Sequence, residues 1–382
     1  MKTCFLYANK YNKVCQKILN TKLSIMEAIM TAEQKQRTLR EIKATQELML
    51  RNSPEYGTLM SITGATTFDS KLKYDSLYTS ATEDMATYYK KFNNPKTFLS
   101  IGASGEQVIN AICCGAKVID VYDSNILCKH AVNLRLAALK GLPKEKLINY
   151  YRTFNPQLFA TFAEYLPEDS LLYWYGVYSS FPIELSGTFI RDFLFTYKRL
   201  DKSLVELMNP YLQGENYIKT QKATLDVEIN YLDCDLYSLP EKIKNKSYDG
   251  MTFSNIYEYI NYGNSVTRKK ANQYRNFIIN EMYPHLNADG SIMVSYLYAW
   301  NEKTKKEFDK MHREHPERLV GTGAISFDKY LDYLNGHTTQ NLAYSYLFDA
   351  LANDHIIKLP TNHIQYGQSI DMSHDMALIL KK

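Results

Sequence analysis

The hydrophobic positions of the chain change their period at Thr97. From there, short apolar runs typical of strands alternate with segments of helical period. TFLSI predicts a first strand, VINAICCGA a helix after the turn GASGE, and KVIDVYD a second strand that ends in Asp123. The amphipathic run NILCKHAVNLRLAALKGL predicts a long helix that Gly141 and Pro143 stop. Two parallel strands joined by a helix make a right-handed βαβ unit.

The strand pattern resumes later in the chain, after an aromatic-rich stretch from 141 to about 225 that predicts helices. VEINYLDCD, YDGMTFSNI and, after the turn NADG, SIMVSYLY predict three further strands, and HIIKLP and HDMALILKK predict a closing pair. Together these elements predict an α/β protein with one seven-stranded mixed sheet. We expect a single sheet domain over 71–382, interrupted by a helical insertion over 141–225.

Residues 1 to about 70 predict an N-terminal helical region. Its apolar positions follow a loose helical period with charges between them. These positions are Met26, Ile29, Met30, Leu39, Ile42, Leu48 and Leu50. We expect this helix to pack against the sheet domain, and the alternative is a helix that lies on a membrane surface.

The composition is that of a globular protein. The chain has 382 residues, of which 45% are hydrophobic and 23% are charged, and this is sufficient to bury a sizeable core. A net charge of +4 is too mild to predict a nucleic-acid partner. The six cysteines form no CxxC pair, and no window has the length of a signal peptide or a membrane span. We therefore expect a cytoplasmic protein without a metal site, touching a membrane at most from one side.

The turn between the first two predicted elements carries the first candidate chemistry. Gly102, Ser104 and Gly105 lie between a strand and a helix, where the backbone can approach a ligand closely. The third glycine of the dinucleotide fingerprint is missing, so an ordinary tight turn is an equal alternative. Asp123 follows at about the ~20-residue spacing at which a carboxylate accepts hydrogen bonds from a ribose diol. Its alternative role is to cap the helix that begins near Asn125.

Two later strand ends add further candidates. Asp235 closes VEINYLDCD, where a carboxylate can accept a hydrogen bond from an adenine amino group, and Asp233 competes for that role. Ser254 and Asn255 follow the next strand and should reach the carboxyl edge of the sheet, where open α/β sheets bind ligands.

Four stretches together resemble the S-adenosylmethionine:diacylglycerol 3-amino-3-carboxypropyl transferases of betaine-lipid synthesis. In YTSATED, Tyr78, Glu83 and Asp84 match the family's Tyr-x-x-x-Trp-Glu-Asp signature, while Thr82 replaces its Trp. LSIGASGEQVINA is similar to the family's Ser–Gly turn. YDSNILCKHAVNLRLAALKGL is similar to its Asp-x-Asn helix, and FSNIYEYI to its motif after the fourth strand. The resemblance covers roughly 74–145 and 225–300, and nothing in 141–225 matches.

The resemblance implies a Rossmann-like class I fold that binds S-adenosylmethionine. The cofactor-binding residues would be Tyr78, Gly102, Ser104, Gly105, Asp123, Ser124, Asn125, Asp235, Ser254 and Asn255. Glu258 and Tyr259 are the first candidates for the base that takes the acceptor's proton, followed by Glu83 and Asp84. Each of these candidates has the alternative role of a solvated carboxylate or a helix cap.

The predicted reaction moves the 3-amino-3-carboxypropyl group to a small-molecule or lipid acceptor and releases methylthioadenosine. Ordinary methyltransferases carry an acidic residue two positions before the first turn glycine, and the neutral Ser100 stands there in this chain. The alternatives are a conventional methyltransferase that releases S-adenosylhomocysteine and a protein that binds the cofactor without turnover. A nicotinamide-dependent oxidoreductase is disfavoured by the missing third glycine.

Overall fold

The computed structural model describes residues 30–53, 76–81, 83–196, 202–254, 256, 273–298, 356–365 and 369–382. Within them the chain forms an α/β fold around a mixed sheet, as the alternating pattern predicts. Asn255, Glu258 and Tyr259, three of the candidate site residues, lie outside the described part of the chain, as do Met26 and Ile29.

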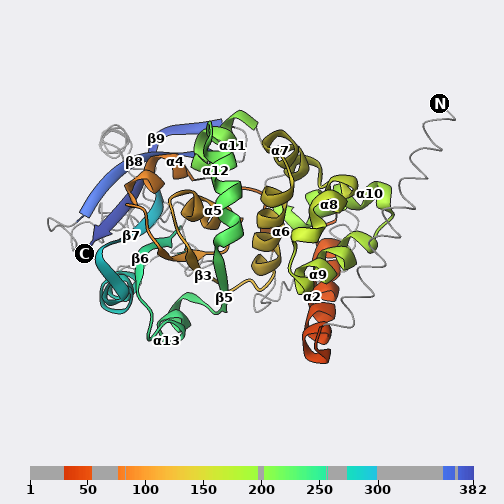
Figure 1. The fold of residues 1–382 in the computed structure, drawn as a ribbon, viewed down its shortest axis with the longest axis horizontal. Coiled ribbons are helices and arrows are strands. Elements are labelled where there is room, and N and C mark those ends of the chain that lie inside the picture. The colour runs from red at the N-terminus through yellow and green to blue at the C-terminus, as the bar shows by residue number, and fades with distance from the viewer. Residues whose placement is uncertain are drawn as a thin grey trace, which may run out of the picture.

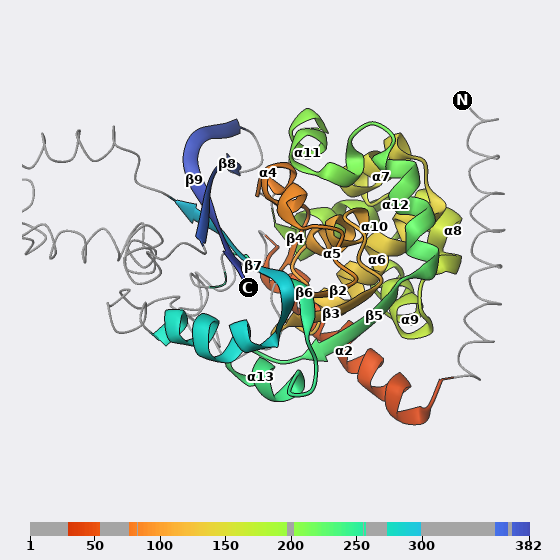
Figure 2. The ribbon, with the colours of Figure 1, turned by 60° about the vertical axis from the view of Figure 1, so that its left-hand side comes forward.

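The sheet strands form at or close to the predicted segments. They are β2 (Thr97–Ile101), β3 (Val118–Asp123), β5 (Glu228–Asp233), β6 (Tyr248–Phe253), β7 (Leu286–Tyr298), β8 (Ile356–Gln365) and β9 (Ser369–Lys381). The order across the sheet is β5-β3-β2-β6-β7-β9-β8. The pairs from β5 to β7 are parallel, whereas β9 is antiparallel to both β7 and β8. Figure 2 shows β8 and β9 together beside β7.

The strand order reverses between β2 and β6. The chain runs from β2 outward to β3 and β5, and then returns to the other side of β2 with β6 and β7. Gly102 follows the last residue of β2, and Ser254 follows the last residue of β6. Open α/β sheets bind ligands at such a reversal, at the carboxyl ends of the strands. The fold therefore brings the predicted turn and Ser254 to the edge where a ligand is expected.

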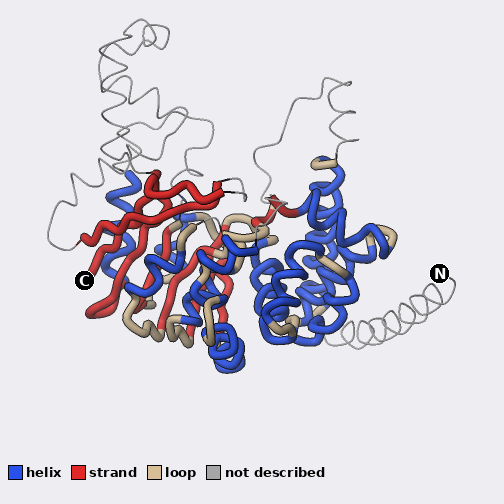
Figure 3. The backbone as a smooth tube through the Cα atoms, turned by 90° about the horizontal axis from the view of Figure 1, so that it is seen from above, coloured by secondary structure: helices blue, strands red, loops and turns tan. Residues whose placement is uncertain are grey.

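Helices make up most of the described residues before β5. They are α2 (Ala32–Arg51), α4 (Met85–Tyr88), α5 (Glu106–Cys113), α6 (Cys128–Gly141), α7 (Lys144–Thr153), α8 (Pro156–Phe162), α9 (Glu168–Ser179), α10 (Ile183–Phe189), α11 (Lys202–Met208) and α12 (Asn216–Ala223). The short helix α13 (Leu239–Lys242) follows β5, and two-residue strands β1 (Leu77–Tyr78) and β4 (Phe195–Thr196) pair with each other. Figure 1 shows α2 and α7–α10 gathered at one end of the molecule, with β6–β9 at the opposite end. The same division into a helical side and a sheet side is visible from above in Figure 3.

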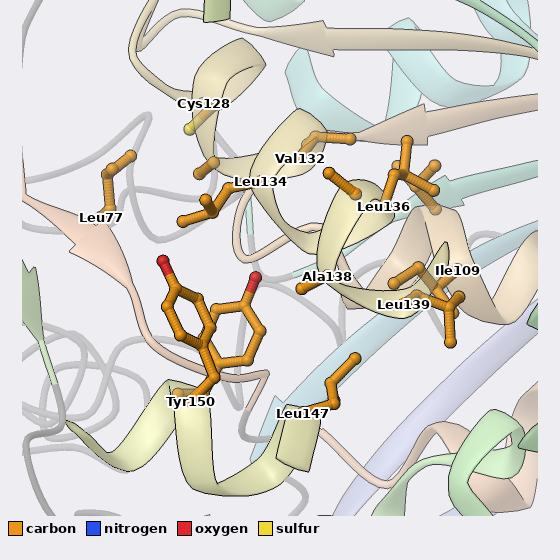
Figure 4. Packing of buried hydrophobic residues seen from close by; sticks show 14 of the residues in the cluster. Leu77, Ile109, Cys128, Val132, Leu134, Leu136, Ala138, Leu139, Leu147 and Tyr150 are labelled. Atoms are coloured by element: carbon orange, nitrogen blue, oxygen red, sulfur yellow. The ribbon is translucent and has the colours of Figure 1, made fainter. Parts of the chain in front are cut away.

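The long helix α6 lies at the centre of the main hydrophobic core. Its residues are buried almost all round, which is typical of a helix covered on every side. Figure 4 shows Leu139 of α6 on the side of Ile109, and Leu134 on the side of Leu77 and Tyr150. The helix thus joins the sheet domain to the aromatic-rich helical segment through one continuous core.

The N-terminal helix α2 packs against α9, but its buried face differs from the predicted one. The buried residues are Thr38, Glu41, Ile42, Thr45 and Met49. Leu39 and Leu50 are 50% and 55% exposed, so the prediction that they belong to the packing face is wrong. Ile42 explains the close docking, because its Cδ1 lies 2.5 Å from where a Cβ would stand on Gly176 of α9. Ile42 fits at this contact because Gly176 has no side chain.

The turn at NADG is predicted before the strand SIMVSYLY, whereas β7 already begins at Leu286. The segment lies inside β7, where Asp289 adopts a left-handed conformation with a φ of 63°. The pairing of β6 with β7 shifts register between Tyr248 and Gly250 at this point. Such a bulge needs the same residue types as a turn, so the sequence pattern does not distinguish them. No described helix has the length and apolar character needed to cross a membrane.

Candidate functional site

The turn between β2 and α5 is tightly closed by its own backbone. The Gly102 amide donates to the Tyr122 carbonyl at 2.9 Å, and the Gly105 amide donates to the Gly102 carbonyl at 2.7 Å. Gly105 has a φ of 83°, and a Cβ there would stand 3.2 Å from the Val132 Cα. Both its left-handed backbone and its nearness to α6 therefore require glycine at this position.

Asp123 joins this turn to the one that follows β3. Its Oδ2 accepts a hydrogen bond from the Ala103 amide at 2.9 Å, and its Oδ1 accepts one from the Asn125 amide at 2.9 Å. Burial raises the pKa of the Asp123 carboxyl above its ordinary value, against the opposing effect of these two donors. Each carboxylate oxygen can accept more than one hydrogen bond, so these contacts leave capacity for a ligand diol. The expected cap role is not observed, because α6 begins at Cys128 with Leu127 as its N-cap and without a capping side chain. The ligand role remains a prediction.

A pocket opens beside Asp123, at the carboxyl ends of β3 and β5. Asp123 and Asp233 are direct register partners on these strands, so their carboxylates face one pocket. The lining residues are Arg37, Val121, Asp123, Asn125, Ile126, Cys128, Lys129, Tyr231, Leu232 and Asp233. Lys129 pairs with Asp169 and lies 5.8 Å from the centre of the Tyr231 ring. Two carboxylates and two cations thus surround an otherwise partly apolar lining.

Asp235 does not close β5, as the sequence led us to expect. The strand ends at Asp233, and Asp235 caps the short turn Leu236–Ser238. Its Oδ1 accepts from the Ser238 amide at 2.9 Å and from the Ser238 hydroxyl at 3.1 Å. The competing residue Asp233 is the one that lines the pocket. Spacing alone cannot separate two aspartates that lie two positions apart.

Glu83 lies at the reversal point of the sheet. Its side chain is buried, with 6% of the residue exposed. The Ser254 hydroxyl donates to its Oε1, while the Tyr88 hydroxyl at 2.5 Å and the Gln107 amide at 2.8 Å donate to its Oε2. Gln107 belongs to the first turn of α5, and Ser254 follows β6. The carboxylate therefore bridges the two elements that flank the end of β2.

Four other predicted site residues are not part of the pocket lining. Asp84 caps α4, because its carboxylate accepts from the Thr87 amide at 3.1 Å and from the Thr87 hydroxyl at 2.7 Å. Tyr78 pairs with Thr196 in the small sheet of β1 and β4. Ser104 is buried in the turn, and Ser124 is exposed.

A buried ion pair that we did not predict, between Arg135 of α6 and Glu106 of α5, supports the turn. The Arg135 guanidinium on α6 donates to the Ser104 carbonyl at 2.7 Å and to Glu106 at 3.0 Å, and it also binds the Thr79 carbonyl. Glu106 in turn accepts from the Ser80 hydroxyl at 2.7 Å. Arginine is almost never fully buried unless it is paired. A single arginine inside the apolar run NLRLAAL is therefore the signal that could have identified it.

A second buried cluster has the composition of a catalytic triad. His130 Nδ1 lies 2.9 Å from the Ser170 hydroxyl, and His130 Nε2 lies 2.9 Å from Glu41 Oε2. Ser170 is 0% exposed and also accepts from the Asn133 amide at 2.8 Å. No substrate can reach this hydroxyl. The cluster joins α2, α6 and α9 and is structural.

Cys113 and Cys114, which adjoin each other at the end of α5, are not activated thiols. Burial raises the pKa of Cys114 to about 12 and also raises that of Cys113, so both are thiols at neutral pH. Among the described residues, no three histidine, cysteine, aspartate or glutamate side chains gather as a metal site would require.

Comparison with known proteins gives little independent information. A scan against protein-family models found no match, and neither did a search of the curated proteins. Among solved structures, the O-methyltransferase from Bacillus cereus in complex with SAH aligns over 93% of each chain, with 6% sequence identity and a TM-score of 0.29. A TM-score of that size carries no argument. The functional interpretation therefore depends on the chain's own geometry.

Proposed function

We propose that the protein is an S-adenosylmethionine-dependent transferase built on the class I Rossmann-like fold. The observation that carries the proposal is the strand order β5-β3-β2-β6-β7-β9-β8 with β9 antiparallel. Numbered from β2, this is the order 3-2-1-4-5-7-6 of class I methyltransferases. A fold by itself does not fix a function. The pocket at Asp123 and Asp233 supplies the second support, because it lies at the strand ends where such folds bind a nucleoside.

The adenosine portion fits the pocket between the ends of β3 and β5. Asp123 would accept from the ribose hydroxyls, and Asp233 would accept from the adenine amino group in place of Asp235. Val121, Ile126 and Leu232 give the lining the apolar area that a flat ring needs. The turn Gly102–Gly105 would lie beside the sulfonium end.

The methionine portion would then extend toward Glu83 and Ser254. Ser100 is neutral and buried, and its hydroxyl donates to the Ile101 carbonyl. It cannot supply the acidic group that ordinary methyltransferases have at this position. Glu83 brings a buried carboxylate to the same strand edge from the segment before β2. We assign the ligand's ammonium group to Glu83.

The transferred group is the finer part of the proposal. In aminocarboxypropyl transfer, the acceptor's lone pair attacks the γ-carbon, the carbon–sulfur bond breaks toward sulfur, and methylthioadenosine leaves. In methyl transfer the same attack falls on the methyl carbon and S-adenosylhomocysteine leaves. The carbon that faces the acceptor decides between them. The neutral Ser100 and the resemblance to the betaine-lipid enzymes favour the first reaction, and the methyl reaction is the second candidate.

The acceptor would be a small molecule or a lipid bound near the helical segment over 141–225. Its proton would pass to a base, for which Glu258 and Tyr259 are the candidates, because Glu83 is assigned to the ligand's ammonium group. Asp84 is less suited because its carboxylate caps α4. A lipid acceptor would require contact with a membrane surface, which co-sedimentation with anionic vesicles at low salt tests directly.

The deciding experiment identifies the product of the cofactor. The purified protein is incubated with S-adenosylmethionine and a cell extract that includes lipids, and nucleosides are quantified by mass spectrometry. Methylthioadenosine above the enzyme-free background supports aminocarboxypropyl transfer, and the acceptor is found by its added mass. S-adenosylhomocysteine would instead make the protein a methyltransferase. Gly105→Arg is the control that blocks the turn, and binding without either product would identify a non-catalytic cofactor-binding protein.

A further inference from the structure

The helix α2 reaches the rim of the nucleoside pocket through one side chain. Arg37 is part of the pocket lining, and its Nη2 lies 3.3 Å from Asp233 Oδ2. This helix precedes β2 in the chain and connects no two strands of the sheet. Its contribution to the pocket is therefore an addition to the α/β core.

The position of Arg37 is determined by contacts deeper in the molecule. Its Nε donates to Glu41 Oε1 at 2.9 Å, and Glu41 Oε2 lies 2.9 Å from His130 on α6. One turn further along α2, the Thr45 hydroxyl lies 2.8 Å from the Tyr173 hydroxyl on α9. A polar chain thus runs from the pocket rim into the buried junction of α2, α6 and α9.

The ion pair with Asp233 does not by itself explain this arrangement. Both side chains are 51% exposed, and exposed pairs stabilise a fold very little. A guanidinium beside a partly apolar pocket can instead contact a ligand, because it is flat and stacks on aromatic rings. A carboxylate also accepts more than two hydrogen bonds, so Asp233 can bind Arg37 and a ligand amino group together.

We propose that Arg37 contacts the ligand as the outer wall of the pocket, with its guanidinium against the purine ring. This inference rests on the proposed function. It makes α2 part of the cofactor site and assigns the recognition of the adenine end to Asp233 and Arg37 jointly.

The test compares two ligands that share the adenosine portion. Isothermal titration calorimetry measures the Kd of S-adenosylhomocysteine and of methylthioadenosine for the full chain and for Arg37→Ala, Arg37→Gln and Arg37→Lys. Loss of the stacked cation should weaken both ligands by the same factor, roughly tenfold. Arg37→Lys should recover only part of the affinity, since an ammonium is not flat. Arg40→Ala, which removes an exposed charge from the same helix, should leave both Kd values within about twofold.

The remaining outcomes separate this inference from the proposed function. If the unaltered protein binds both ligands and the folded Arg37→Ala and Arg37→Gln variants bind them equally well, Arg37 lies outside the site. If Arg40→Ala weakened both ligands as much as Arg37→Ala does, the effect would come from net charge alone. The proposed contact between Arg37 and the ligand would then be wrong. A loss for S-adenosylhomocysteine alone would place Arg37 at the methionine end and contradict the adenine assignment. Failure of the unaltered protein to bind either ligand would remove the proposed function and this inference with it.

Discussion

The carboxylates of this protein differ in the groups that donate hydrogen bonds to them. Asp123 accepts from two backbone amides of two separate turns, and Asp84 and Asp235 cap short helical segments. Glu83 accepts hydrogen bonds from the neutral groups of Tyr88, Gln107 and Ser254. A buried carboxylate of this kind at a ligand edge is suited to binding a cationic group. The chemistry of each acid therefore follows from its partners rather than from its place in a motif.

The variant Glu83→Gln tests this distinction at the methionine end of the site. It should weaken S-adenosylhomocysteine roughly tenfold or more, because a charge-assisted hydrogen bond to the ammonium group is lost. Methylthioadenosine has no ammonium group, so its Kd should change less than about twofold. Calorimetry of both ligands measures the two effects.

A charge-matched control is available at the opposite end of β2. Asp249 accepts from the Lys96 and Thr97 amides there, so Asp249→Asn removes one negative charge far from the turn. Its Kd for S-adenosylhomocysteine should equal that of the unaltered protein. Equal weakening of both ligands by Glu83→Gln would show that Glu83 only supports the fold.

At the scale of elements, α2 packs against the rest of the protein through polar contacts as well as apolar ones. The buried face includes Glu41 and Thr45, which contact His130 and Tyr173. The imidazole of His130 stacks on the Tyr173 ring with 4.0 Å between centroids. This polar face explains why the hydrophobic period of the N-terminal region predicted the packing of the helix but not the residues that make it.

The stability of this contact should depend on pH through Glu41. Burial would raise the pKa of Glu41, but the hydrogen bonds and charges of His130 and Arg37 outweigh burial and lower it below the usual 4.5. A carboxyl with a lowered folded-state pKa stabilises the fold above the unfolded-state pKa, and this contribution disappears as the pH falls through the folded-state value. We expect Glu41→Gln to cost about 3 kcal/mol near neutral pH.

Urea unfolding at about pH 6 and about pH 3 measures this difference. The gap between Glu41→Gln and the unaltered protein should shrink at the lower pH, because the stabilisation from a lowered carboxyl pKa is lost as the pH falls. Glu33→Gln, at the exposed start of the same helix, should show only a small difference at either pH. If Glu41→Gln lowers the free energy of unfolding by the same amount at both pH values, the loss would come from packing and not from charge.

At the scale of the molecule, the sheet and the helical segment meet around α6 and the turn after β2. Arg135 of α6 binds Ser104 in the turn, Glu106 at the start of α5 and Thr79 in the segment before β2. The guanidinium also lies 3.8 Å from the centre of the Tyr151 ring on α7. One buried cation therefore fixes the turn relative to both parts of the molecule.

Ligand binding to this turn should stabilise the whole chain. S-adenosylhomocysteine at about a hundred times its Kd should add about 2.7 kcal/mol to the free energy of unfolding. For a chain of 382 residues this corresponds to a rise in Tm of about 3 °C. NAD at the same concentration should leave Tm unchanged, since the third glycine of the dinucleotide fingerprint is absent. Differential scanning calorimetry measures both, and a shift with NAD alone would favour an oxidoreductase.

The sequence by itself determined where the main elements of the α/β core lie. Local periodicity placed β2, β3, β5 and β6 and ended α6 at Gly141, because strand and helix periods depend on neighbouring residues. It also located the glycine turn and Asp123, because glycine adopts the left-handed backbone that the turn has at Gly105 without strain.

Only the tertiary structure decided which side chains meet. The pairing of Glu83 with Ser254, of Arg135 with Glu106 and of Arg37 with Asp233 joins residues that are distant in sequence. The choice of Asp233 over Asp235 for the pocket depends on where β5 ends, which its pairing with β3 fixes. Periodicity reports which face of an element is buried, whereas a site is made by faces of different elements that the fold brings together.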